Sequence, residues 1–477
     1  MTIHLSLNRY VWPLGFLTIA LFCQTAVLLA ADKPNLIWIM ADDLGWGDLG
    51  CFGQKKIKTP CLDRMAAEGI LFTSAYCGTS VCAPSRASLI TGLHMGHCPI
   101  RANREVQPEG QMPLPKAHVT VAELLQRAGY RTGLFGKWGL GFPGSGSEPT
   151  RRGFDTFYGY NCQRHAHGYY PQYLWRNDHR EPLPCNAGGK QAQYSHDSIT
   201  AEALRWVHAQ RTQPFFLYFA VTIPHAQFQV PDCGPYANEN WPEDEKRMAS
   251  MITRLDRDIG RLFDLLKELQ IDERTLVFFV SDNGAMGSYK EHDLEFFDSN
   301  GPFRGFKRSM YEGGLRVPAI ARWPGRIKPG AVSDEPWAFW DFLPTAAEVA
   351  GFELPRDLQT DGVSIAPLLF GRSLPRRQYF YWELHEGPTQ QALRFGDWKA
   401  VRTTINRPLE LYDLRADRGE TRDLAKERPE LVAQAEALMK SARVDSADFP
   451  LRAPQAKSKP KAQKTAQKSP VTKPATD

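Results

Sequence analysis

The sequence predicts an α/β protein: a large mixed, mostly parallel sheet sandwiched by helices, followed by a smaller C-terminal antiparallel sheet with one helix. Two observations lead to this prediction. Short, continuously apolar segments alternate with segments of helical periodicity up to about Leu369, as in β-α-β-α chains whose strands are buried on both faces. Beyond that point the apolar segments are shorter and separated by turns.

The central strands are predicted by four apolar segments, at 36–41, 130–135, 215–221 and 276–280. Helical patterns such as 121–128 and 248–269 fall between them. In open parallel sheets, sites lie beyond the carboxyl ends of the strands. Polar residues that follow these segments are therefore candidates for one common site, namely Asp42, Asp43, Lys137, His225, Asp282 and Asn283.

Four regions are expected along the chain: a signal peptide at 1–31, a catalytic domain at 32–370, a C-terminal subdomain at 371–450 and a disordered tail at 451–477. The subdomain is predicted from four short strands and one final amphipathic helix, at 379–382, 391–394, 398–402, 409–413 and 429–442. The tail is rich in Lys, Pro and Ala and has almost no large apolar side chain, a composition typical of disorder.

The N-terminus predicts export. Arg9 precedes an apolar stretch that ends at Ala30-Ala31, the pattern of a secretory signal peptide. An uncleaved anchor is the alternative, which Pro13 disfavours because it shortens the usable helix. We therefore expect a periplasmic or secreted protein with no stable membrane span after cleavage.

Charge and cysteine content narrow the function further. The net charge of +5 equals that of the tail from Ala453 onward, which has six Lys and one Asp, so the body is neutral and nucleic acid is not an expected partner. Eight cysteines follow the signal, and seven remain when Cys82 is set aside for its motif. An odd number leaves at least one unpaired, and spacing assigns no disulfide.

The segment 82–92 reads C-A-P-S-R-A-S-L-I-T-G. Pro84 suits the first turn of a helix, so Cys82 is expected just before a helix N-terminus, where the dipole lowers a thiol pKa and favours anions. The segment resembles the C-x-P-S-R-x4-T-G motif of the type I sulfatases. A phosphatase-type Cys-x5-Arg loop is excluded, because position 88 is Ser.

Asp42, Asp43, Asp282 and Asn283 form an all-oxygen set that suits Ca²⁺, and less well Mg²⁺, rather than zinc. Taken alone, each pair also fits a turn or a helix cap. The resemblance implies that these four residues bind Ca²⁺ together with the modified Cys82.

A second motif strengthens the resemblance: the segment 305–318 is similar to the family's G-x-K-x-x-x-Y-E-G-G-x-R-V-P. The likeness covers about residues 33–450 and implies an alkaline-phosphatase-like fold. It also implies that a formylglycine-generating enzyme converts Cys82 to formylglycine (3-oxoalanine). The other catalytic residues that it implies are Arg86, Lys137, His225 and Lys307.

The mechanism implied by the resemblance begins with attack on sulfur by one hydroxyl of the hydrated aldehyde at position 82. His225 and Lys307 protonate the leaving oxygen. The second hydroxyl then allows sulfate to be expelled and the aldehyde to be restored.

One position departs from the family pattern. The Lys137 segment usually reads G-K-W-H-L-G, and its His is taken as the base in sulfate release, but position 139 is Gly here. His165 and His167 are candidate substitutes or substrate contacts, with surface loop residues as the alternative. His292 and Arg304, in the long loop before Lys307, are further candidates for substrate binding.

The function expected from these residues is release of sulfate from a sulfated carbohydrate or, less expected, an aryl sulfate. Two alternatives stay open. One is a formylglycine-dependent phosphonate or phosphodiester hydrolase on the same fold. The other is a sulfated-glycan-binding pseudoenzyme, which Gly139 suggests.

Overall fold

The computed structural model describes residues 33–454, so the predicted signal peptide and all but the start of the predicted tail lie outside the described residues. The main body is built on a ten-stranded sheet. In spatial order its strands are β13 (Ala331–Ser333), β2 (Ile70–Phe72), β12 (Ala319–Arg322), β11 (Thr275–Ser281), β1 (Asn35–Ala41), β10 (Phe215–Ala220), β6 (Arg131–Lys137), β7 (Thr156–Tyr160), β8 (Tyr173–Arg176) and β9 (His179–Pro182).

The centre of this sheet is parallel, from β11 through β1, β10 and β6 to β7, and antiparallel pairs lie toward both edges. The register aligns Ala41 with Ser281 and Ala220 with Gly136. The predicted mostly parallel sheet is confirmed, and its register brings the carboxyl ends of four central strands to one edge.

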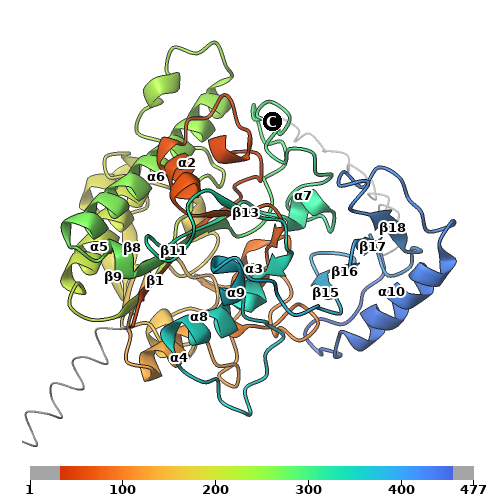
Figure 1. Ribbon diagram of the computed structural model, residues 1–477. Helices are drawn as coiled ribbons and strands as arrows, with labels where there is room; N and C mark the ends of the chain where they lie inside the picture. Colours follow the sequence, from red (N-terminus) through yellow and green to blue (C-terminus); the bar gives the residue numbers. More distant parts are fainter. Residues whose placement is uncertain (1–32, 455–477) are drawn as a thin grey trace, which may run out of the picture.

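Residues of β1 alternate between two cores, as a strand buried on both faces requires. Leu36, Trp38 and Met40 pack on one side and Ile37 and Ile39 on the other. Figure 1 shows the helices of the first side below the sheet and those of the second side above it. The first set is α3 (Cys82–Thr91), α4 (Val121–Arg127), α8 (Phe342–Ala350) and α9 (Ala366–Leu369), and the second is α2 (Pro60–Glu68), α5 (Ser195–Ala209) and α6 (Glu243–Glu268).

A four-stranded antiparallel sheet forms the C-terminal part, at the right of Figure 1. Its strands are β15 (Phe380–Leu384), β16 (Gln390–Phe395), β17 (Trp398–Arg402) and β18 (Glu410–Asp413), and α10 (Pro429–Ser441) packs against it. These elements confirm the predicted small sheet with one helix. The remaining elements are the strand pairs β3 (Ala75–Tyr76) with β14 (Trp337–Ala338) and β4 (Glu105–Val106) with β5 (Gly110–Gln111), and the short helix α7 (Glu312–Leu315).

Buried ion pairs join the small sheet to the main body. The Lys399 ammonium on β17 lies 2.9 Å from both the Glu312 and the Glu420 carboxylates, and all three side chains are fully buried. Arg101 pairs with Glu383 on β15 at 2.5 Å. Since a buried charge without a partner is costly, these pairs hold the two sheets in one arrangement.

No helix among residues 33–454 combines the length and the apolarity needed to cross a bilayer. All eight cysteines in this range are unpaired.

Candidate active site

Four acidic or amide residues meet where the parallel strands end. Asp42 and Asp43 follow β1, and Asp282 and Asn283 follow the neighbouring β11. Ligand atoms of Asp42, Asp43, Asp282 and Cys82 all lie within 4.8 Å of one another, and all four residues are buried. The sequence-predicted metal residues are thus brought together around the sulfur of Cys82.

Cys82 is the first residue of α3, and its Sγ lies 3.5 Å from Oδ1 of Asp42. Burial and then the charge of Asp42 raise the pKa of the Cys82 thiol far above its ordinary value. The expectation that the helix N-terminus lowers this pKa is therefore wrong, because desolvation outweighs the dipole here. The raised pKa favours a neutral Cys82 thiol over a thiolate at neutral pH.

Arg86, one turn further along α3, bridges the ends of β11 and β6. Its Nε and Nη2 donate to Oδ2 of Asp282 at 3.1 and 2.9 Å, and its Nη1 donates to the backbone carbonyl of Lys137 at 2.8 Å. Ser85 Oγ donates to the Asp282 carbonyl at 2.5 Å. The first turns of α3 thus fix Cys82 relative to β11 and β6.

Two buried lysines neutralise the carboxylates. Lys137 Nζ lies 2.6 Å from Asp42 Oδ2, and Lys307 Nζ lies 2.7 Å from Asp43 Oδ2. Burial opposes ionisation of Asp42, but Lys137 and its neighbours hold the pKa of Asp42 well below its usual range. Burial and the charge of Asp42 instead raise the pKa of Asp282 to about 7. The carboxyl groups of Asp42 and Asp282 therefore lie close together but have opposite pKa shifts.

The oxygen set fits a hard cation. Asn283 Nδ2 donates to Asp43 Oδ1 at 2.7 Å, while Asn283 Oδ1 is buried without a hydrogen-bond partner in the described part of the chain. A buried amide oxygen without a hydrogen-bond partner, together with three carboxylates, provides the kind of ligand set that a hard cation such as Ca²⁺ prefers. The three carboxylates are already balanced by Arg86, Lys137 and Lys307, so a dication would make the site net positive and attractive to an anionic ester.

A cavity of about 460 Å³ opens onto this cluster. Its walls are formed by segments that follow the central strands and by β4 and β5. It is lined by Cys82, Asn103, Glu105, Gln111, Gln163, His167, His225, Met286, Gly287, Ser288, Phe306, Lys307 and Arg308.

His225 and His167 stack over the cavity with ring centres 4.5 Å apart and 11° between their planes. His225 Nε2 lies 3.5 Å from Asp43 Oδ2, and its Nδ1 contacts the Ala226 carbonyl. Burial, followed by the charge of Lys307, lowers the pKa of His225 to about 4, and burial with His225 lowers the pKa of His167 to about 3. Both rings are neutral at pH 7 in this arrangement.

Three predicted substrate contacts need correction, because none of them lines this cavity. His292 is buried, and its Nδ1 lies 2.8 Å from Glu245 of α6, so it anchors its loop. Arg304 lies over the Tyr311 ring and donates to the Glu420 carbonyl, toward the small sheet. His165 packs between Tyr160 and Tyr173, with Nδ1 3.3 Å from Glu109. Of the four predicted contacts, His167 alone reaches the cavity.

Sequence reasoning missed several residues of the cavity. Asn103 Oδ1 accepts the Ala83 N–H at 3.0 Å and so caps the start of α3. Phe306, which is 45% exposed, forms an apolar rim beside Lys307. Gln111 and Gln163 form part of the wall. Only Phe306 had a signal in the sequence, since it lies inside the segment around Lys307.

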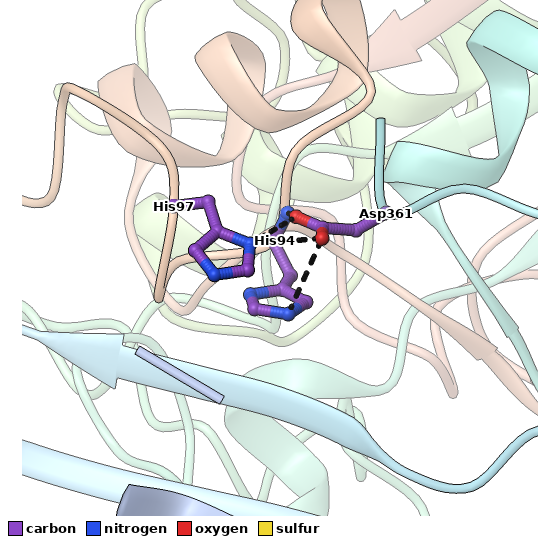
Figure 2. Close-up of side chains that lie close together, drawn as sticks. All are labelled: His94, His97 and Asp361. Atoms are coloured by element: carbon purple, nitrogen blue, oxygen red, sulfur yellow. Dashed lines mark hydrogen bonds and ion pairs between the residues drawn. The ribbon is translucent and has the colours of Figure 1, made fainter. Parts of the chain in front are cut away.

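A second group of histidines supports α3 from its other end (Figure 2). His97 Nδ1 lies 2.8 Å from Asp361 Oδ1, and His94 Nε2 lies 3.7 Å from the same oxygen. The two imidazoles stack 4.6 Å apart with 25° between their planes. The Asp361 N–H also donates to the carbonyl of Gly92, the residue after α3, so this group stabilises the C-terminal end of the helix that carries Cys82.

Comparison with known families now places the chain. Residues 34–352 match the family model described as Sulfatase, and residues 301–444 match the one described as N-sulphoglucosamine sulphohydrolase, C-terminal. The first match covers more than half of the chain, so the protein belongs to the sulfatase family and is a hydrolase of sulfuric esters.

Individual relatives are similar over most of their length. N-acetylgalactosamine-6-sulfatase of Canis lupus familiaris is 36% identical over 392 residues, which cover 78% of this chain and 72% of the relative. Arylsulfatase A of Homo sapiens is 34% identical over 457 residues, covering 85% and 86%. The crystal structure of Ps i-CgsB in complex with k-i-k-neocarrahexaose superposes with a TM-score of 0.79 at 29% identity, covering 88% of this chain and 95% of that one.

Proposed function

We propose that this sulfatase releases sulfate from a sulfated carbohydrate, using formylglycine made from Cys82 and a bound Ca²⁺. The observation that carries the proposal is the buried cluster of Asp42, Asp43, Asp282 and Cys82 at the floor of an open cavity. Two relatives support the substrate class: one is named for a sulfated N-acetylgalactosamine, and the other was crystallised with a neocarrahexaose.

Asp42, Asp43, Asp282 and Asn283 would hold the cation beside the residue at position 82. When both groups are in place, the hydrated aldehyde supplies the nucleophile and Ca²⁺ stabilises negative charge next to it. Arg86 pairs with Asp282, and Lys137 pairs with Asp42. These two cations therefore place positive charge at the floor of the cavity.

The remaining residues handle protons. Asp43 raises the pKa of Lys307 against the effect of burial, so Lys307 stays charged and offers an N–H to the leaving oxygen. His225 faces the same region with Nε2 and serves as the second donor once it is protonated beside the anionic substrate. His167, neutral and stacked on His225, is the residue proposed to take the proton in sulfate release, where the usual histidine is replaced by Gly139.

The test combines mass spectrometry with substrate turnover, on protein coexpressed with a formylglycine-generating enzyme. The Cys82 peptide should lose about 18 Da on conversion of thiol to aldehyde. Converted protein should release sulfate from N-acetylgalactosamine 6-sulfate faster than it cleaves a phosphodiester.

Three results would contradict this proposal. Turnover by protein with an intact Cys82 thiol would exclude formylglycine. Preference for phosphodiester would favour the alternative hydrolase. Conversion without any sulfate release from sulfated sugars would favour a glycan-binding pseudoenzyme.

We also propose that the protein is exported, because Arg9 and the apolar stretch through Ala31 have the composition of a signal peptide. N-terminal sequencing of protein recovered outside the cytoplasm should begin near Asp32. A mature chain that retains Met1 would contradict cleavage.

A further inference from the structure

The space beside Gly139 is filled by another residue. Gly139 has φ of +76°, a left-handed conformation that side chains rarely adopt. A Cβ at this position would lie 2.8 Å from Nε2 of Gln163, closer than a normal contact. Gly139 and Gln163 are therefore a matched pair, since Gln163 keeps its position only while position 139 has no side chain.

Gln163 lines the cavity, and both polar atoms of its amide, Oε1 and Nε2, are buried without a hydrogen-bond partner in the described part of the chain. The residue as a whole is only 6% exposed. Because a buried amide left unpaired is destabilising, such a group in the lining of a cavity indicates a ligand that supplies the missing hydrogen bonds.

Gln111 adds a second donor to the same wall. Its Oε1 accepts the backbone N–H of Gln163 at 3.4 Å, which orients the amide and leaves Nε2 free. Gln111 is 1% exposed, and its Nε2 has no partner in the described part of the chain. The two amides thus offer donors from both residues and an acceptor from Gln163.

We propose that Gln111 and Gln163, with Gly139 making room, form a subsite for an uncharged hydrogen-bonding substituent of the substrate, such as a sugar hydroxyl or N-acyl group. The inference rests on the proposed function, because it concerns the alcohol portion of the sulfated carbohydrate. Together the donors of the two amides and the acceptor of Gln163 match a group that both donates and accepts, as hydroxyl and N-acyl groups do.

The charges around the wall favour a neutral substituent over an acidic one. Glu105 lies on the lining beside the amides, and Arg164 is 3.8 Å from its carboxylate. The cationic side chains of the lining, Lys307 and Arg308, pair with Asp43 and Glu386, and they belong to the segment that also contributes Phe306. A carboxylate on the sugar at the amide wall would meet Glu105 without a lysine or arginine devoted to it.

The experiment compares selectivity between two esters, N-acetylgalactosamine 6-sulfate and 4-nitrophenyl sulfate. Gln163→Leu removes the amide at nearly constant volume, and we expect the ratio of kcat/KM for sugar over aryl sulfate to fall about 10-fold or more. Gly139→Ala, which displaces the amide without deleting it, should shift the ratio in the same direction. Gln172→Leu changes an exposed glutamine elsewhere and should leave the ratio unchanged.

Folding and function are controlled separately. Thermal unfolding should show Gln163→Leu at least as stable as the wild type, because an unpaired buried amide is removed. If that variant unfolds, Gln163→Asn, which keeps the amide one methylene shorter, replaces it and should reduce the ratio as well. A ratio unchanged in every folded variant overturns the subsite alone. A converted wild type that hydrolyses no sugar sulfate overturns the proposed function, and the subsite with it.

Discussion

Lys399→Met should destabilise the junction between the large sheet and the small one. Lys399 Nζ is 2.9 Å from Glu312 and 2.9 Å from Glu420, and none of the three side chains is exposed. The substitution removes the lysine that lies between two buried carboxylates, so that Glu420 loses its cationic partner and the two carboxylates repel each other.

The magnitude follows from what remains. Glu312 keeps hydrogen bonds from Tyr76 at 2.7 Å and Arg316 at 3.1 Å, so its charge stays compensated. Glu420 loses its cation, but burial already raises its pKa to about 7. It can therefore take up a proton, which removes part of the free-energy penalty of a buried, unpaired charge. The loss in free energy of unfolding should therefore lie at the lower end of the range for a broken buried pair, about 3 kcal/mol at pH 8.

Urea unfolding followed by tryptophan fluorescence measures this loss, since Trp398 and Trp382 lie in the small sheet. The double variant Lys399→Met, Glu420→Gln should recover at least about 1 kcal/mol, because the uncompensated carboxylate is gone. Lys426→Met, at an exposed position, should change stability by less than about 0.5 kcal/mol.

The pH dependence has a defined sign. A carboxyl group whose pKa is higher in the folded than in the unfolded protein destabilises the fold when it ionises. This destabilisation grows as the pH rises from the pKa in the unfolded protein toward the pKa in the folded protein. Glu420 behaves this way, so the deficit of Lys399→Met should shrink as pH is lowered from 8 to 6. A loss under about 1 kcal/mol, or a double variant no more stable than the single one, would refute the reasoning.

Three further predictions concern the site and the junction. Cys82→Ser should lose turnover in a sulfate-release assay, since serine cannot form a hydrated aldehyde; turnover near the wild-type rate would contradict the nucleophile. Chelation should lower both activity and the unfolding temperature, with recovery on adding Ca²⁺; insensitivity of both would exclude the cation site. Burial opposes ionisation of Glu383, but His385 and Arg101 lower its pKa to about 2, so its stabilisation, about 3 kcal/mol, should disappear as pH falls from about 4.5 to about 2 in acid unfolding. Glu383→Gln should flatten that part of the profile.

Most of the sheet and the cluster of acidic residues around Cys82 were predictable because they depend on local patterns. A strand buried on both faces is apolar throughout, so β1 and β11 stand out, and Asp42 and Asp282 must then lie at one edge of a parallel sheet. The thiol of Cys82 was misjudged for the opposite reason. Its pKa depends on how deeply α3 is buried and on its distance to Asp42, which no local pattern contains.

Contacts across the chain account for the other errors. His292 resembles a site residue in a long loop, but Glu245 of α6, 47 residues earlier in the chain, takes its Nδ1. Arg304 lies near Lys307 in sequence, yet the C-terminal part supplies its partner, the Glu420 carbonyl. Both histidine and arginine are equally suited to ligands and to structural anchoring, so only the tertiary partner distinguishes the two roles.

The neighbours of Gly139 in the structure change how its missing side chain is interpreted. In the sequence, its departure from the family pattern suggests a lost base and hence a pseudoenzyme. In the structure, the vacated space is occupied by Gln163, and the stacked pair of His167 and His225 stands over the same cavity. A Cβ at position 139 would lie 2.8 Å from Gln163 Nε2, so the amide in its present position depends on the glycine. If Gln111 and Gln163 form the proposed subsite, Gly139 marks a change of substrate contact rather than decay of the site.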